Sequence, residues 1–277
     1  MRFRKIYVEI SNLCNLKCRF CPGTKREPGR MTAEQFSALL PKLRPYTDYL
    51  YFHVMGEPLC HPQLEQFLTL AGQAGFKAIL TTNGTLLAKH QEMLLNNPGL
   101  YKVNISLHAF EANDLAVPFV QYLDNCFAFG RAAAGKKLVV YRLWNQGGAD
   151  DLNTDIVTRM KSHFTNPWVE EQKGIRVDQR VYLEYGEKFD WPDMDAEEGR
   201  GQFACRGLKD QIGVLWDGTV IPCCLDHEGD LALGNLFEQD LEEVLSAPRA
   251  KAISDGFARG EAVEPLCRRC GYARRFE

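Results

Sequence analysis

The chain has 277 residues, of which 45% are hydrophobic and 25% are charged, and its formal net charge is −3. This length is sufficient for one large α/β domain and a small second one. The charge balance excludes a general attraction to nucleic acid or to an anionic membrane, and no apolar run approaches the about 20 residues that span a bilayer.

Short apolar segments alternate with amphipathic ones over most of the chain. The expected strands are Lys5–Ile10, Tyr49–Met55, Lys77–Thr81, Lys102–Leu107, Lys137–Trp144 and Val181–Glu187. The expected helices are one starting after Thr32, then Pro62–Ala74, Leu87–Asn96, Val117–Ala133 and Asn153–His163. Such alternation favours parallel βαβ units, and six of them are too few for a closed barrel. We therefore expect an α/β fold, a partial TIM-like (β/α)6 barrel with its chemistry at the carboxyl ends of the strands.

The pattern changes beyond Asp195, where helical periodicity fades and glycine and cysteine become more frequent. Two short strands, Gly213–Leu215 and Thr219–Ile221, flank a turn that contains Gly218, which predicts a hairpin. The amphipathic stretch Leu241–Ile253 predicts a helical cover. We expect two domains, the barrel over residues 1–200 and a small hairpin-plus-helix module over residues 201–277.

The amino terminus lacks a signal-peptide pattern, so we expect a cytoplasmic protein. This expectation makes the ten cysteines informative. A reducing compartment disfavours disulfides and leaves metal or redox chemistry as the main reason to cluster thiols. Cys60 and Cys126 stand alone and are expected to be small, partly buried hydrophobes. The other cysteines fall into two groups.

The first group is Cys14, Cys18 and Cys21, a C-x3-C-x2-C loop that follows the first expected strand. Three thiolates on one tight loop can bind three irons of a cubane and leave the fourth iron without a protein ligand. A zinc site is the alternative, but it needs a fourth ligand, and residues 22–41 contain neither Cys nor His.

This spacing, together with the aromatic Phe20 and the position after a first strand, resembles the radical S-adenosylmethionine (SAM) superfamily. The resemblance implies an oxygen-sensitive [4Fe–4S] cluster whose open iron is chelated by SAM. It also implies that reduction of the cluster cleaves SAM to methionine and a 5′-deoxyadenosyl radical, which takes a hydrogen atom from the substrate.

Further motifs carry the same resemblance. Met55-Gly56-Glu57-Pro58 is similar to the family's Gly-Gly-Glu-Pro turn, although Met55 replaces a glycine whose conformation the turn could require. Arg142 could pair with the methionyl carboxylate of SAM or form a structural ion pair. The SAM-binding residues that the resemblance implies are Phe20, Gly56, Glu57, Pro58, Thr82, Asn83, Ser106 and Arg142.

The second group of cysteines resembles the SPASM/twitch family of auxiliary-cluster domains, in its single-cluster twitch form. The resemblance implies an auxiliary [4Fe–4S] cluster held by Cys205, Cys223, Cys267 and Cys270. Cys224 would point to the opposite face of its strand, which leaves its role open. A structural zinc ribbon is the alternative.

In such enzymes the auxiliary cluster collects an electron from the substrate, and the cysteine spacing resembles that of radical SAM alcohol dehydrogenases. This implies an oxidoreductase that oxidises or otherwise functionalises a C–H bond of a small, hydroxylated substrate, with flavodoxin or ferredoxin as reductant. The base could be Tyr7, Glu9, His53 or His108, although both histidines could be structural.

Three alternatives remain. A maturase of a ribosomal peptide or protein often has a fused peptide-binding domain, for which a first strand near Lys5 leaves no room. A tRNA-modifying enzyme is disfavoured by the acidic balance. A simple electron carrier has no use for an open iron.

Overall fold

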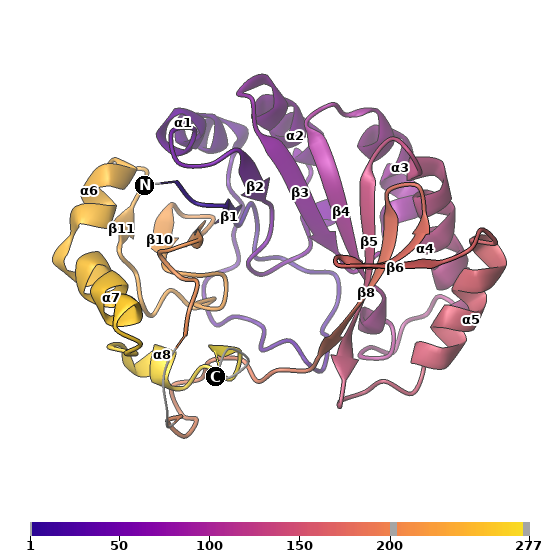
Figure 1. Ribbon diagram of the computed structural model, residues 1–277. Helices are drawn as coiled ribbons and strands as arrows, with labels where there is room; N and C mark the ends of the chain where they lie inside the picture. Colours follow the sequence, from indigo (N-terminus) through magenta and orange to yellow (C-terminus); the bar gives the residue numbers. More distant parts are fainter. Residues whose placement is uncertain (1, 200–203, 274–277) are drawn as a thin grey trace.

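The computed structural model describes residues 2–199 and 204–273. Its centre is an 11-stranded sheet in the order β11-β10-β9-β1-β2-β3-β4-β5-β8-β7-β6 (Figure 1). The parallel strands of the barrel are β1 (Lys5–Val8), β2 (Tyr49–Tyr51), β3 (Lys77–Thr82), β4 (Leu100–Ser106), β5 (Leu138–Gln146) and β8 (Val181–Glu187). The expected partial barrel of six parallel strands is confirmed.

Helices cover the outer face of the curved sheet (Figure 1). They are α1 (Ala33–Leu43), α2 (Leu64–Gln73), α3 (Leu87–Asn96), α4 (Phe119–Ala133) and α5 (Asn153–His163). Thr32 caps α1, as the predicted helix start after Thr32 requires, and forms a capping box in which its hydroxyl accepts the Gln35 N–H at 3.2 Å. Cys126 is fully buried in α4, as expected of an isolated cysteine.

The first two strands are shorter than predicted, because the chain turns across the barrel mouth after Val8 and Tyr51. The prediction that β2 runs on to Met55 is wrong, since the backbone N–H groups of Met55 and Glu57 bond to the Glu9 carboxylate and the Leu13 carbonyl. The other barrel strands and the helices α2 to α5 differ from prediction by at most two residues at either end.

A hairpin that the sequence did not predict ends the sheet beyond β8. It consists of β6 (Val169–Glu171) and β7 (Gly174–Asp178), which pair antiparallel. Residues of β6 are exposed and two of its three are Glu, so no alternation of apolar side chains marks them.

The predicted carboxy-terminal hairpin is confirmed as β9 (Gln211–Val214) and β10 (Thr219–Ile221), followed by β11 (Gly234–Asn235). Its turn needs glycine at Gly218, whose φ is +87°. The helical cover expected over Leu241–Ile253 is present as two helices. The structure has α6 (Leu241–Ser246) and α7 (Pro248–Ala258), because Pro248 begins a new helix after an extended Ala247, and α8 (Pro265–Arg268) follows.

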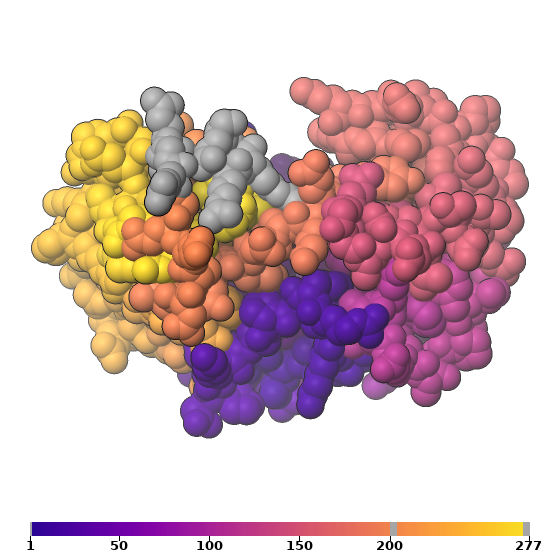
Figure 2. Space-filling model, turned by 90° about the horizontal axis from the view of Figure 1, so that it is seen from below, coloured from indigo at the N-terminus to yellow at the C-terminus, as the bar shows by residue number. Residues whose placement is uncertain are grey.

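The hairpin extends the barrel sheet, since β9 pairs parallel with β1 and places Gly213 opposite Tyr7. Figure 2 shows the amino-terminal segment, in indigo, between the orange-and-yellow carboxy-terminal module and the magenta part of the barrel. The expected domain boundary between residues 200 and 201 lies outside the described residues, so the two-domain division stays a proposal. No helix in the described residues is long and apolar enough to cross a membrane.

Candidate functional site

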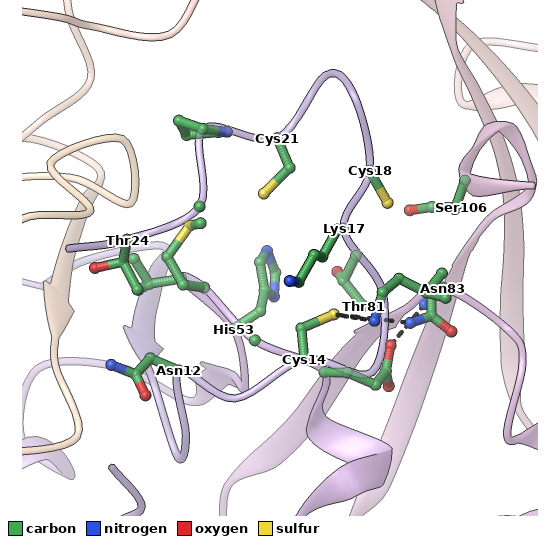
Figure 3. A pocket seen from close by; sticks show the side chains of 18 of the residues that line it. Asn12, Cys14, Lys17, Cys18, Cys21, Thr24, His53, Thr81, Asn83 and Ser106 are labelled. Carbon is green, nitrogen blue, oxygen red and sulfur yellow. Dashed lines mark hydrogen bonds between the residues drawn. The ribbon is translucent and has the colours of Figure 1, made fainter. Parts of the chain in front are cut away.

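A cavity of about 490 Å³ lies at the carboxyl ends of β1 to β4, under the loop that follows β1. Cys14, Cys18 and Cys21 all line it, and their sulfur atoms point into one common space (Figure 3). Burial raises the pKa of all three thiols, that of Cys14 to about 11. The thiols are therefore protonated without a metal, and bound irons would displace these protons.

Two asparagines hold the cysteine loop. Asn113 Nδ2 donates to Cys18 Sγ at 3.1 Å, and Asn113 Oδ1 accepts the Lys17 N–H at 3.1 Å. Asn83 Nδ2 lies 4.0 Å from Cys14 Sγ (Figure 3) and donates to Asn15 Oδ1 at 2.9 Å. An N–H that faces a cluster thiolate stabilises its negative charge. Sequence reasoning missed Asn113, because it belongs to no motif and lies 95 residues from Cys18.

The turn after β2 needs glycine at one position only. Gly56 has φ +78°, and an added Cβ would lie 2.4 Å from the Ser11 carbonyl oxygen. Met55 is not among the described non-glycine residues with positive φ, so its replacement of a glycine is accommodated. Glu57 is buried and accepts the N–H groups of Leu59 and Asn83 at 3.0 and 2.7 Å, while burial raises its pKa to about 7.

Most of the residues predicted to bind SAM surround this first cavity. Those that line it are Phe20, Gly56, Glu57, Thr82, Asn83 and Ser106. Pro58 lies behind it, buried as the first residue of the 3-10 helix η1 (Pro58–Cys60). Arg142 does not line it. Its Nε lies 3.3 Å from Glu184 Oε2 and its guanidinium lies over the Trp144 ring, so the ion pair left open by the sequence is the one present.

A second cavity of about 350 Å³ lies between the barrel and the carboxy-terminal module. Tyr7 and His53 line it, with their rings 5.1 Å apart, and His53 also lines the first cavity. Burial lowers the pKa of His53 to about 3, so its imidazole is neutral at pH 7. Its Nδ1 has no hydrogen-bond partner among the described residues. His53 is thus the shared wall of both cavities.

The other two candidate bases line neither cavity. Glu9 is fully buried in a bidentate pair with Arg26, at 2.8 and 2.9 Å, and also accepts the Met55 N–H. His108 Nδ1 lies 3.1 Å from the Arg142 carbonyl oxygen and its ring packs on Phe20. Both side chains are thus occupied by contacts around the barrel mouth and do not reach either cavity in this structure.

We expect Arg26→Met to lower the free energy of unfolding by about 3 kcal/mol or more, because it leaves Glu9 as an unpaired buried carboxylate. Urea unfolding of anaerobically purified protein measures this. The control is Arg4→Met, whose pair with Asp210 is 3.8 Å long and has an exposed arginine, and which should cost under about 1 kcal/mol. Equal losses in the two variants would contradict a structural role for the Glu9–Arg26 pair.

The second group of cysteines converges on one small apolar cavity of the carboxy-terminal module. Its thiols are those of Cys205, Cys223, Cys267 and Cys270. Cys224 does not line this cavity and instead lines the second cavity beside Tyr7. Among the described residues no three His, Cys, Asp or Glu side chains lie close enough to bind one metal ion. Thiolates of a cubane need no such approach, since each binds a different iron.

Comparisons with known proteins agree with this geometry. The family model of the radical SAM superfamily matches residues 8–126, and that of an iron–sulfur cluster-binding domain, SPASM, matches residues 205–271. The S-adenosyl-L-methionine-dependent 2-deoxy-scyllo-inosamine dehydrogenase of Niallia circulans is 23% identical over 97% of this chain and 92% of its own. A GTP 3′,8-cyclase of Xanthomonas campestris is 24% identical over 98% of this chain and 75% of its own.

Two solved structures have the same fold. BtrN in complex with AdoMet and 2-DOIA superposes with a TM-score of 0.65 at 19% identity, over 98% of this chain and 93% of its own. SuiB of Streptococcus suis bound to S-adenosylmethionine superposes with a TM-score of 0.66 at 17% identity, over 92% and 68%. At these identities the similarity concerns the fold.

Proposed function

Because the chain belongs to the radical SAM superfamily and carries a SPASM iron–sulfur cluster-binding domain, we propose that it oxidises or otherwise functionalises a C–H bond of a small, hydroxylated substrate. Its cofactors are SAM, a SAM-binding [4Fe–4S] cluster and an auxiliary [4Fe–4S] cluster. The observation that carries the proposal is a cavity that lies between the two cysteine groups and shares His53 with the SAM-site cavity.

The two cysteine groups would hold the clusters. The first cluster would be bound by Cys14, Cys18 and Cys21, and the auxiliary one by Cys205, Cys223, Cys267 and Cys270. When bound, the first cluster and SAM supply a radical that removes a hydrogen atom, and the auxiliary cluster supplies an acceptor for one electron. A carbon that carries a hydroxyl becomes a carbonyl when it loses that hydrogen atom, the electron and the hydroxyl proton. The chain itself must therefore accept a proton.

His53 is best placed to accept this proton. The choice rests on position, since its Nδ1 is unpartnered among the described residues and it borders the cavities on both sides; its lowered pKa makes the free imidazole a weak base. Tyr7 borders the same second cavity, but burial raises its pKa well above the ordinary value. Its hydroxyl therefore stays protonated and cannot act as a base.

Formation of 5′-deoxyadenosine tests the proposed function. Anaerobically reconstituted protein is incubated with SAM and dithionite, or with flavodoxin or ferredoxin as the proposed natural reductant. A radical SAM enzyme forms 5′-deoxyadenosine, and faster formation with a hydroxylated compound identifies a substrate. A protein that only transfers electrons forms none.

We expect His53→Gln to lower product formation by about 100-fold, because a general base typically contributes at least that factor. The yield of 5′-deoxyadenosine should persist, so the ratio of product to 5′-deoxyadenosine falls. Both are measured by chromatography with a substrate that the unmodified protein oxidises. His163→Gln is the control, since His163 pairs with Asp124 outside both cavities. An unchanged ratio in His53→Gln rules out its role as base.

A peptide substrate is the second candidate. A solved structure of SuiB bound to its precursor peptide SuiA superposes on 98% of this chain with a TM-score of 0.65. The peptide proposal expects 5′-deoxyadenosine formation to respond to a peptide and not to small hydroxylated compounds.

A further inference from the structure

The wall of the second cavity is rich in cations and hydrogen-bond donors. Lys5, Arg142 and Arg206 line it, and no Asp or Glu belongs to its wall in the part of the chain that the structure describes. The side of the wall toward the carboxy-terminal module includes Cys205, Cys223 and Cys270 of the second cysteine group. Arg206 is paired with Asp210 at 3.4 Å. Arg142, on β5, is also paired, with Glu184 at 3.3 Å, and Lys5 comes from β1.

Lys5 has no ion-pair partner among the described residues. Its Nζ lies 5.0 and 5.3 Å from the ring centroids of Tyr7 and Tyr51. Burial lowers its pKa, and the charge of Arg142 lowers it further. Cys224 and Asp210 act in the opposite direction and partly offset this lowering of the pKa. A partly buried ammonium beside two aromatic rings and a second cation is destabilised until a stronger counter-ion reaches it.

Arg142 and Trp144 add donors without acceptors. They are alternate residues of β5, so their side chains share one face of the strand. Trp144 Nε1 can only donate, and it is buried without a partner among the described residues. Arg142 Nε lies 3.3 Å from Glu184 Oε2 but is not aligned for a hydrogen bond. Buried donors without acceptors are rare in folded proteins and indicate a ligand that supplies acceptors.

We propose that the second cavity binds an oxyanion of the substrate, a carboxylate or a phosphate, through Lys5, Arg142 and Trp144. This inference rests on the proposed function and narrows its substrate to an anionic hydroxylated compound, with its reactive carbon on the His53 side. The inosamine named for the relative from Niallia circulans is an amine. An ammonium group in this cavity would face Lys5 and Arg142, so the substrates of the two proteins differ in charge.

Calorimetric titration of the anaerobic holoenzyme tests this binding without turnover. The probes are D-gluconate, inorganic phosphate, the uncharged polyol D-glucitol and 2-deoxy-scyllo-inosamine. We expect at least one anion to bind, and both neutral polyol and amine to bind at least about tenfold more weakly, since a hydrogen bond to a charged group contributes about 1.5 kcal/mol or more. Tighter binding of gluconate identifies a carboxylate, and tighter binding of phosphate identifies a phosphate ester.

Two variants connect the binding to the named side chains. Lys5→Met should weaken binding of the anion at least about tenfold. Trp144→Phe, which keeps an aromatic ring but removes the indole N–H, should weaken binding by a smaller factor. Lys161→Met is the matched control, because Lys161 also lies over a ring, that of Trp168, but outside both cavities. Failure of both anions to bind, equal binding of the amine, or unchanged anion binding in both cavity variants overturns the inference.

Failure of this inference is distinguishable from failure of the proposed function. If the chain binds the anion but forms no 5′-deoxyadenosine, the anion site is supported and the proposed function fails. A chain that forms 5′-deoxyadenosine and binds neither anion has the activity with another substrate class.

Discussion

A Cys18→Ala chain is expected to form no measurable 5′-deoxyadenosine from SAM and dithionite. The three cysteines of the loop share one cavity, and Cys18 is also the thiol that accepts the N–H of Asn113. Removal of a residue that hydrogen-bonds to a metal ligand typically lowers metal affinity or activity by about 10- to 100-fold. Removal of a cluster ligand itself should lower activity by more. We therefore expect a loss of well over about 100-fold, measured by chromatography.

The matched control for this variant is Cys60→Ala. Cys60 follows Pro58 and Leu59 in η1 and does not line the first cavity, so its removal should leave SAM cleavage unchanged. Cleavage that survives in Cys18→Ala, or is lost equally in Cys60→Ala, would contradict the assignment of the loop cysteines as cluster ligands.

A Cys267→Ala chain is expected to retain some SAM cleavage and to form no oxidised product. Cys267 lies in the small cavity of the carboxy-terminal module, apart from the first cavity. Its loss should remove the auxiliary cluster, so that iron falls from about eight to about four atoms per chain, as expected for two cubanes and then one. Without that cluster the substrate electron has no acceptor, and 5′-deoxyadenosine forms without product.

Cys224→Ala is the control for the cluster itself, because Cys224 lies outside the small cavity and should leave about eight irons per chain in place. Full product formation by Cys267→Ala would rule out an electron-accepting role for the auxiliary cluster. About four irons with one zinc in the unmodified chain would make the carboxy-terminal module a structural zinc site.

Local sequence patterns were sufficient to predict the barrel and both groups of cysteines. The strands and helices predicted from apolar periodicity differ from those of the structure by a few residues at their ends. The loop cysteines were predictable as a group because they lie within one short segment. The expectation that Cys224 points to the opposite face of a strand is wrong, because β10 ends at Ile221 and Cys223 and Cys224 follow it in a turn. Both line the second cavity, and of the two only Cys223 also lines the small cavity of the carboxy-terminal module.

What the sequence could not reveal depends on contacts between distant segments. Arg142 meets Glu184 because β5 and β8 pair in a register that places these residues opposite each other. Glu9 pairs with Arg26 because the loop after β1 folds back onto that strand. Neither contact follows from spacing along the chain, which is why the sequence leaves open whether Arg142 pairs with SAM or with a protein carboxylate, and why Glu9 is among the candidate bases.

The EPR spectrum of the reduced, unmodified protein, recorded with and without SAM, tests the open iron position most directly. If Cys14, Cys18 and Cys21 hold a cubane with one iron free of protein ligands, SAM binds that iron and shifts the signal of one cluster, while the signal of the auxiliary cluster stays unchanged. Two cluster signals that SAM leaves unaltered would contradict an open, SAM-binding cluster in this chain.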